Sequence, residues 1–122
     1  MRFLPVVAAL VMTATSALSA EAPVRHIVSF KFKAEATPAD IQKIERGFAE
    51  LKSKISEVQS IEWGTNISPE DRAKGFTHMW VVTFADMAAL KAYIVHPDHV
   101  AFVTLLKPSL DDVFVFDFQP KP

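Results

Sequence analysis

The chain is 122 residues long, carries a formal net charge of −1 and contains no cysteine. This length allows a single domain. Without cysteine, the chain has no disulfides, thiolate nucleophiles, Cys-ligated zinc, iron–sulfur clusters or acylated-cysteine anchor. A charge this close to zero has no polyanion-binding character, so we expect no nucleic-acid partner.

The first 20 residues have the pattern of a signal peptide. Arg2 provides a short positive region, residues 3–11 are apolar, and residues 13–20 supply the small side chains of a cleavage region. The apolar stretch is too short to span the roughly 30 Å of bilayer hydrocarbon. We therefore expect an exported protein, periplasmic or secreted, with a mature domain over residues 21–122 and no membrane association after cleavage.

The first half of the mature chain predicts a strand, a helix and a second strand. Residues 26–33 alternate in polarity as a strand does. Thr37 is a good N-cap and Pro38 suits the first helical position. The helix that follows carries one apolar stripe, with Gly47 as a weak point that a close backbone approach would explain. The stripe consists of Ile41, Ile44, Phe48, Leu51 and Ile55. Residues 58–66 then predict a strand.

The second half predicts a strand, a broken helix and a last strand. A short helical turn over residues 68–71, ended by Gly75, leads into a strand over residues 77–84.

Asp86 is expected to cap a helix that runs to Ile94 or Val95. Pro97 interrupts this helix, and Asp98 can cap a second segment over residues 99–106. Pro108 stops that segment before a strand over residues 113–119.

The predicted order is βαββαβ, which indicates an α+β, ferredoxin-like fold with both helices on one face of an antiparallel sheet. The strands are rich in Ile, Val, Trp and Phe, so the other face would expose a large apolar patch in a monomer. Two such sheets facing each other would bury it. A homodimer is therefore the expected partner arrangement.

Five side chains are candidates for acid–base chemistry: His26, His78, His96, His99 and the single tyrosine, Tyr93. Neutral histidine takes or gives a proton near pH 7, and a tyrosine hydroxyl can hold a developing oxyanion. Structural histidines, a helix-breaking corner at residues 96–97 and a cap at Asp98 are the plainer alternatives. Pro97 spoils a metal-binding face, and the chain has no GxSxG, HExxH, P-loop or GxGxxG motif, so we expect no metal and no cofactor.

The last strand places an acid among inward-facing aliphatic residues. Val113, Val115 and Asp117 share one face, and the three phenylalanines at 114, 116 and 118 share the other. A buried acid needs a partner. The fold places His99 or His26 within reach, and such a pair would orient the imidazole as a catalytic base requires.

Four short motifs in order resemble the stress-responsive dimeric α/β-barrel (Dabb) domain family: residues 26–33, 75–78, 93–99 and 116–118. The resemblance extends from about residue 24 to residue 120. It implies ferredoxin-like chains whose sheets pair as a dimeric α/β barrel with the helices outside.

The motifs also resemble those of a cyclase within this family, and this resemblance implies site residues. His99 corresponds to the catalytic base, Tyr93 to its tyrosine, and Asp117 to the acid that orients the base. His26 and His78 correspond to pocket histidines. The other residues expected to line the substrate pocket, and so to form its wall, are Val28, Phe30, Phe48, Trp80, Phe102, Val113 and Val115.

Three positions depart from that cyclase's pattern. Phe48 replaces a tyrosine, and Trp80 and Val103 replace small residues. Bulkier walls narrow or reshape the cavity, so a long polyketide substrate does not carry over. Export also separates the protein from cytosolic acyl-CoA products.

Three functions remain open, and whether the protein is an enzyme stays undecided. The favoured one is an exported stress-response dimer that binds a small apolar ligand. The alternative is an acid–base enzyme, with cyclase-like or lyase chemistry, in which His99 abstracts a proton α to a carbonyl and Tyr93 steadies the enolate. An interaction module that uses the sheet edges ranks lowest. Family membership alone does not define a reaction.

Overall fold

The computed structural model describes residues 2–5, 8–9 and 22–122. Most of the expected signal peptide lies outside these residues, so that prediction stays a prediction. Within the described part of the chain, no helix is long and apolar enough to cross a membrane. The elements, in chain order, are β1 (Val24–Phe32), α1 (Pro38–Lys54), β2 (Ser60–Thr65), β3 (His78–Phe84), α2 (Met87–Val95), α3 (Pro97–Leu106), the 3₁₀ turn η1 (Lys107–Ser109) and β4 (Leu110–Phe118).

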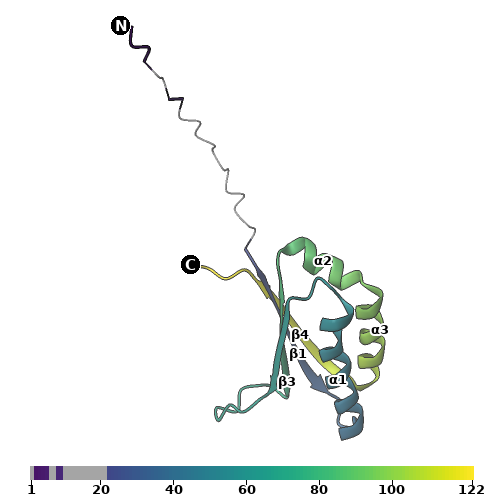
Figure 1. Ribbon diagram of the computed structural model, residues 1–122. Coiled ribbons are helices and arrows are strands. Elements are labelled where there is room, and N and C mark those ends of the chain that lie inside the picture. The colour runs from purple at the N-terminus through teal and green to yellow at the C-terminus, as the bar shows by residue number, and fades with distance from the viewer. Residues whose placement is uncertain (1, 6–7, 10–21) are drawn as a thin grey trace.

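The four strands form one antiparallel sheet in the order β2-β3-β1-β4, and all the helices cover the same face (Figure 1). This confirms the α+β, ferredoxin-like prediction. The register aligns residues across β3, β1 and β4. His26 lies between Val82 and Asp117, and Phe30 lies between His78 and Val113. Each of these rows of side chains therefore points to one face of the sheet.

Helix α1 begins where the local signals predict. Thr37 is the N-cap, and a reciprocal capping box joins it to Asp40, with both hydrogen bonds at 3.1 Å. The Thr37 backbone N–H holds the pKa of Asp40 below its usual value. The apolar stripe is confirmed, because Ile44, Phe48 and Leu51 are all buried against the sheet.

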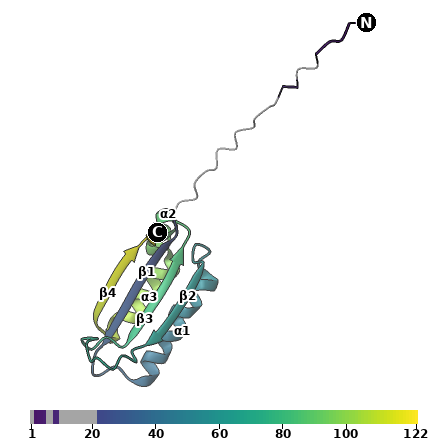
Figure 2. The ribbon, with the colours of Figure 1, turned by 90° about the vertical axis from the view of Figure 1, so that its left-hand side faces the viewer.

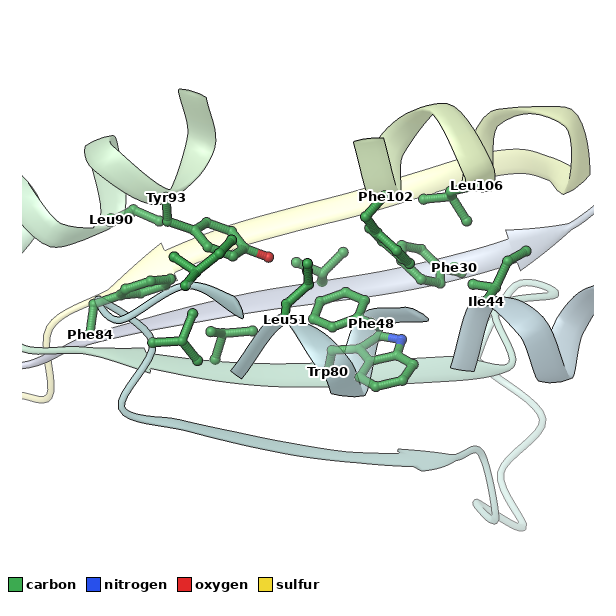
Figure 3. Close-up of a cluster of buried hydrophobic side chains, with 14 of the residues drawn as sticks. Phe30, Ile44, Phe48, Leu51, Trp80, Phe84, Leu90, Tyr93, Phe102 and Leu106 are labelled. Carbon is green, nitrogen blue, oxygen red and sulfur yellow. The ribbon is translucent and has the colours of Figure 1, made fainter. Parts of the chain in front are cut away.

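Aromatic rings pack with aliphatic side chains in the core between the helices and the sheet (Figure 3). Phe48 of α1 stacks on Trp80 of β3 with centroids 4.1 Å apart, and Phe102 of α3 meets Phe48 edge-on at 5.0 Å. Gly47 permits this closeness, since a Cβ there would lie 3.2 Å from Leu105 Cδ2. The close approach expected at Gly47 is confirmed.

The corner between α2 and α3 differs in one detail from expectation. Asp86 caps α2 as predicted, accepting a hydrogen bond of 2.8 Å from the Ala89 N–H. The expectation that Asp98 caps α3 is wrong, because Pro97 already occupies the first helical position and places Asp98 in the first turn. The cap is His96, whose Nδ1 accepts from the Asp98 N–H at 3.1 Å.

The segment between β2 and β3 is a turn-rich loop, so the prediction of a helical turn over residues 68–71 is wrong. Asn66 Oδ1 accepts from the Ser68 N–H at 3.1 Å, and Ser68 Oγ accepts from the Glu70 N–H at 3.3 Å. Such side-chain bonds compete with helical ones. Gly75 ends the loop with φ +86, the left-handed backbone expected of it. The loop projects away from the helices (Figure 1).

The face of the sheet opposite the helices is open, as Figure 2 shows. Phe114, Phe116 and Phe118 of β4 are 50%, 56% and 42% exposed, and Met79 of β3 is 47% exposed. The helix-side residues of β4 are open too: Val113 is 43% exposed and Val115 is 51% exposed. Asp117 lies on the same face, and its side chain is 34% exposed because the helices leave β4 largely uncovered.

Candidate functional site

The first element of the site is a histidine–carboxylate pair on neighbouring strands. His26 Nδ1 lies 2.5 Å from Asp117 Oδ1. The ring of His26 is buried, whereas the Asp117 side chain is 34% exposed. The carboxylate can only accept at neutral pH, so Nδ1 of His26 carries the proton of this bond. Of the two partners considered for Asp117, the structure selects His26, although the resemblance implied that Asp117 orients His99.

Tyr93 of α2 lies between two histidines. Its ring centroid is 5.8 Å from that of His26 and 4.4 Å from that of His99. Tyr93 is 1% exposed, and burial raises its pKa well above the usual value, so the phenol stays protonated. Among the described residues its hydroxyl has no hydrogen-bond partner. Figure 3 shows this hydroxyl pointing into the layer between helices and sheet. It is available to donate to a bound oxygen.

His99 of α3 is held by the end of the preceding helix. Its Nδ1 lies 2.9 Å from the carbonyl oxygen of Ile94. A carbonyl only accepts, so Nδ1 bears the hydrogen and Nε2 keeps its lone pair. Burial lowers the pKa of His99; the Ile94 carbonyl opposes this, and the charges of His26 and His96 add to it. His99 is therefore a neutral imidazole near pH 7, the form that acts as a base.

His78 lies apart from these residues. Its Nε2 is 3.0 Å from Glu45 Oε2 of α1, and its Nδ1 is 2.8 Å from Thr77 Oγ1. Along β1, the partner of His78 is four residues from His26, a separation of about 13 Å at strand geometry. Trp63 lies parallel to the His78 ring, 6.0 Å away. The structure does not bring His78 into the cluster of His26, Tyr93 and His99.

Most of the expected wall residues are core residues. Val28, Phe30, Phe48, Trp80 and Phe102 are all buried, and Trp80 is completely so. Its indole Nε1 is a buried donor without a partner among the described atoms, which costs about 1–3 kcal/mol.

Two of the expected wall residues, Val113 and Val115, form an exposed apolar border beside Asp117, since all three share the helix-side face of β4. Val103 is partly buried.

A hollow of about 770 Å³ lies on the open side of the sheet, beneath the loop between β2 and β3. This hollow was not predicted from the sequence. Its apolar lining includes Trp63, Ile67, Phe76, Met79 and Phe114. The available signal was the pair of apolar residues at 67 and 76 within an otherwise polar loop, of which Ile67 is 93% exposed.

No group of three or more His, Cys, Asp or Glu side chains within the described part of the chain is placed to hold a metal ion. The spacing of His96 and His99 has a structural explanation instead. His96 Nδ1 caps α3 and His99 Nδ1 bonds to Ile94. Each ring therefore already uses one nitrogen in shaping the α2–α3 corner.

Two curated relatives and two solved structures resemble the chain over most of its length. A stress-response A/B barrel domain-containing protein, HS1 of Arabidopsis thaliana, is 37% identical over 83% of this chain and 93% of its own. Olivetolic acid cyclase of Cannabis sativa is 29% identical, over 80% and 97% respectively. The hydroxynitrile lyase of Passiflora edulis has a TM-score of 0.77 and 29% identity, over 84% and 95%.

A further structure comes from Bacteroides fragilis and is described as a dimeric protein of unknown function with a ferredoxin-like fold. It has a TM-score of 0.65 and 26% identity, over 80% of this chain and 96% of its own. The family match itself covers residues 24–120, which include every strand and helix described above. The chain belongs to the family of the stress responsive A/B barrel domain.

Proposed function

We propose that the cluster of His99, Tyr93, His26 and Asp117 is an acid–base site that acts on a small carbonyl compound. The observation that carries this proposal is the state of His99, whose Nδ1 donates to the Ile94 carbonyl and whose ring, with Nε2 left without a hydrogen bond among the described residues, packs against the ring of the buried Tyr93. Two proteins similar to this chain are named as enzymes, a cyclase and a hydroxynitrile lyase, which supports a catalytic function for this site.

The chemistry follows from the two groups. Nε2 of His99 takes a proton from a hydroxyl or from a carbon next to a carbonyl. The Tyr93 hydroxyl donates to the oxygen on which negative charge develops. Burial keeps that phenol protonated, so it acts as a donor and not as a base.

The substrate is small. The stacked rings of Phe48 and Trp80 occupy the core that a long chain would need. The exposed border of Val113 and Val115 leads to Asp117 instead, and it suits an apolar group of a few carbons. This class of substrate differs from an extended polyketide.

A proton-exchange assay tests this function. Ethyl acetoacetate in D₂O exchanges its α-protons, and the protein is expected to accelerate this exchange, as followed by proton NMR. His99→Ala should lower the catalysed rate by about 10²-fold or more. His96→Asn is the matched control, because an asparagine still caps α3. Equal rates for His99→Ala and the unmodified protein would refute the site, provided that circular dichroism shows both folded.

We infer that the open face of the sheet is the interface of a homodimer. Phe114, Phe116 and Phe118 present three neighbouring aromatic side chains there, together with Met79. A patch of this kind marks an interaction surface in a protein of this size. The structure from Bacteroides fragilis is described as dimeric, which supports a second copy of this chain as the occupant.

A non-catalytic function has one specific observation in its favour. The hollow beneath the loop has the volume of small-molecule pockets and a largely apolar lining. It would bind a small apolar ligand beside Trp63, a residue that is 43% exposed. A change in tryptophan emission on titration with an apolar dye, abolished by Phe76→Asp, would support this function; unchanged emission would count against it.

We expect the protein to be exported from the cytoplasm. The observation behind it is the apolar run over residues 3–11 followed by small residues up to Ala20. Mass spectrometry of the protein recovered from its own cells should find a mature N-terminus near Glu21. A chain that retains Arg2 would overturn this proposal.

A further inference from the structure

A chain of hydrogen bonds runs from α1 through His78 to the hydroxyl of Thr77. His78 Nε2 lies 3.0 Å from Glu45 Oε2, and His78 Nδ1 lies 2.8 Å from Thr77 Oγ1. The His78 side chain is 7% exposed and that of Glu45 is 22% exposed, so both groups are largely shielded from water. Thr77 is exposed. The chain therefore begins at a shielded carboxylate and ends at a hydroxyl on the surface.

The chemistry of the three groups fixes the direction of these bonds. The Glu45 carboxylate only accepts, so Nε2 of His78 carries a hydrogen. In the neutral ring Nδ1 then keeps its lone pair, and it accepts the hydrogen of the Thr77 hydroxyl. An imidazole that accepts a hydroxyl hydrogen while a carboxylate holds its other nitrogen is the arrangement that activates a hydroxyl as a nucleophile.

Two aromatic rings flank the imidazole of His78. The ring of Phe32 meets it edge-on with centroids 5.1 Å apart, and the ring of Trp63 lies parallel to it at 6.0 Å. Both ring nitrogens are already bonded, so the orientation of the imidazole is fixed by contacts on several sides. A group held in this way needs no rearrangement before it acts on a bound molecule.

Thr77 lines the hollow of about 770 Å³ beneath the loop between β2 and β3, together with the apolar side chains of Phe76 and Met79. It also lines a smaller hollow of about 370 Å³ on the same loop. The lining of this smaller hollow includes none of the residues of the proposed dimer interface. A small molecule therefore has an approach to Thr77 that lies outside that interface.

We propose that Thr77 is the nucleophile of an acyl-transfer site, with His78 as its general base and Glu45 as the positioning residue that holds the imidazole. The substrate class is a carboxylic ester with a short apolar acyl group, which the apolar lining of the larger hollow accommodates. Asn66 and Lys74 line both hollows and can donate to the ester oxygen. This site shares no residue with the proposed acid–base site and goes beyond that function.

The step balances with water as the only further reactant. Thr77 Oγ1 attacks the ester carbonyl carbon while its proton passes to Nδ1 of His78. The tetrahedral intermediate then expels the alkoxide, which takes that proton from Nδ1 and leaves as an alcohol. The acyl group remains as an ester of Thr77. Water attacks this ester in the same way, so that the carboxylic acid departs and the Thr77 hydroxyl is restored.

The first test uses the unmodified protein and p-nitrophenyl butyrate, whose acyl group is short and apolar and whose cleavage is followed by absorbance. Peptide mass spectrometry of the protein, quenched in acid during turnover, is expected to find the butyryl group on Thr77. Butyryl groups on lysine side chains alone would overturn the proposal. This measurement needs no variant, so it does not depend on whether a substituted chain folds.

The second test compares two threonines that line the same hollows. Thr77→Val removes the hydroxyl and should lower the rate of ester cleavage by about 10²-fold or more. Thr65→Val is the matched control, because Thr65 also lines both hollows and lies opposite His78 in the β2–β3 ladder. It should cleave the probe at the unmodified rate. Thr77→Ser keeps a hydroxyl and should retain cleavage. Equal rates for Thr77→Val and Thr65→Val would refute the nucleophile.

The role of Glu45 is tested with Glu45→Gln. The amide oxygen still accepts from Nε2–H of His78, but the charge that compensates a protonated imidazole is gone. For the probe, kcat should fall by about 10²-fold while KM stays the same, because the hollow is unchanged. Glu50→Gln is the control, since Glu50 forms an exposed ion pair with Lys54 on the same helix, and both constants should be unchanged. An equal fall in kcat in the two variants, or a change in KM alone in Glu45→Gln, would overturn this role.

Discussion

His26 and Asp117 face each other across the β1–β4 ladder and are joined at 2.5 Å although 91 positions separate them in the chain. The contact links the first strand of the domain to the last. It also fixes the orientation of the one buried imidazole that lies beside Tyr93 on the sheet. The same two side chains therefore join the sheet edge and belong to the proposed acid–base site.

Removal of this contact is expected to destabilise the fold. Asp117→Ala leaves the buried Nδ1–H of His26 without its acceptor, and the free energy of unfolding should fall by about 1–3 kcal/mol. The lower end of that range applies because the Asp117 side chain is 34% exposed. Urea denaturation measures the change. Asp111→Ala is the control, since Asp111 forms an exposed ion pair with Lys31 at 3.6 Å, and the loss of that pair should change stability little.

A larger side chain at Gly47 is expected to force α1 and α3 apart. Even a Cβ there lies 3.2 Å from Leu105 Cδ2 and 3.4 Å from Phe102, so Gly47→Val overpacks the interface and should cost about 1–3 kcal/mol. Ala49→Val places the same side chain on the exposed face of α1 and should cost less than about 1 kcal/mol. Equal thermal unfolding of the two variants would contradict the close approach.

A charge at Phe116 is expected to separate the proposed dimer. Phe116 is 56% exposed in the single chain, so Phe116→Asp should leave the fold intact and remove only association. Light scattering at micromolar concentration should then give the mass of one chain for the variant and of two for the unmodified protein. Ala92→Asp, on the exposed surface of α2, should remain a dimer. A variant at Phe116 that is still dimeric would place the interface elsewhere.

The half-buried His99 should make stability depend on pH. Its pKa is lowered in the folded protein from an ordinary value of 6.5, chiefly by burial. Below that value the unfolded chain takes up a proton that the folded chain does not yet bind, so stability falls as the pH falls from 6.5 toward the folded pKa. His99→Gln should flatten this part of the stability curve in urea titrations. His96→Asn should not, and an identical slope in both variants would assign the effect to another group.

The local features of the fold were predictable because short-range patterns determine them. The Thr37–Asp40 capping box, the Asp86 cap and the apolar stripe of α1 involve residues three or four positions apart, and all appear as expected. Strand alternation also placed His26 and Asp117 on the helix-side face. Two local predictions were wrong because alternative hydrogen bonds compete there and the sequence pattern does not show which one forms. His96 caps α3 in place of Asp98, and side-chain hydrogen bonds replace a helical turn after Asn66.

The amino-acid pattern alone predicted the order of the strands and of the two helical regions, the starts of α1 and α2, and the face on which the strand residues lie. Packing between distant segments selects the histidine that Asp117 contacts, and the strand register separates His78 from His26 by placing them at different rows of the β1–β3 ladder. The placement of the helices leaves Val113 and Val115 uncovered. The physical reason is that register and helix placement depend on packing between segments far apart in the chain, whereas alternation and capping depend on neighbours.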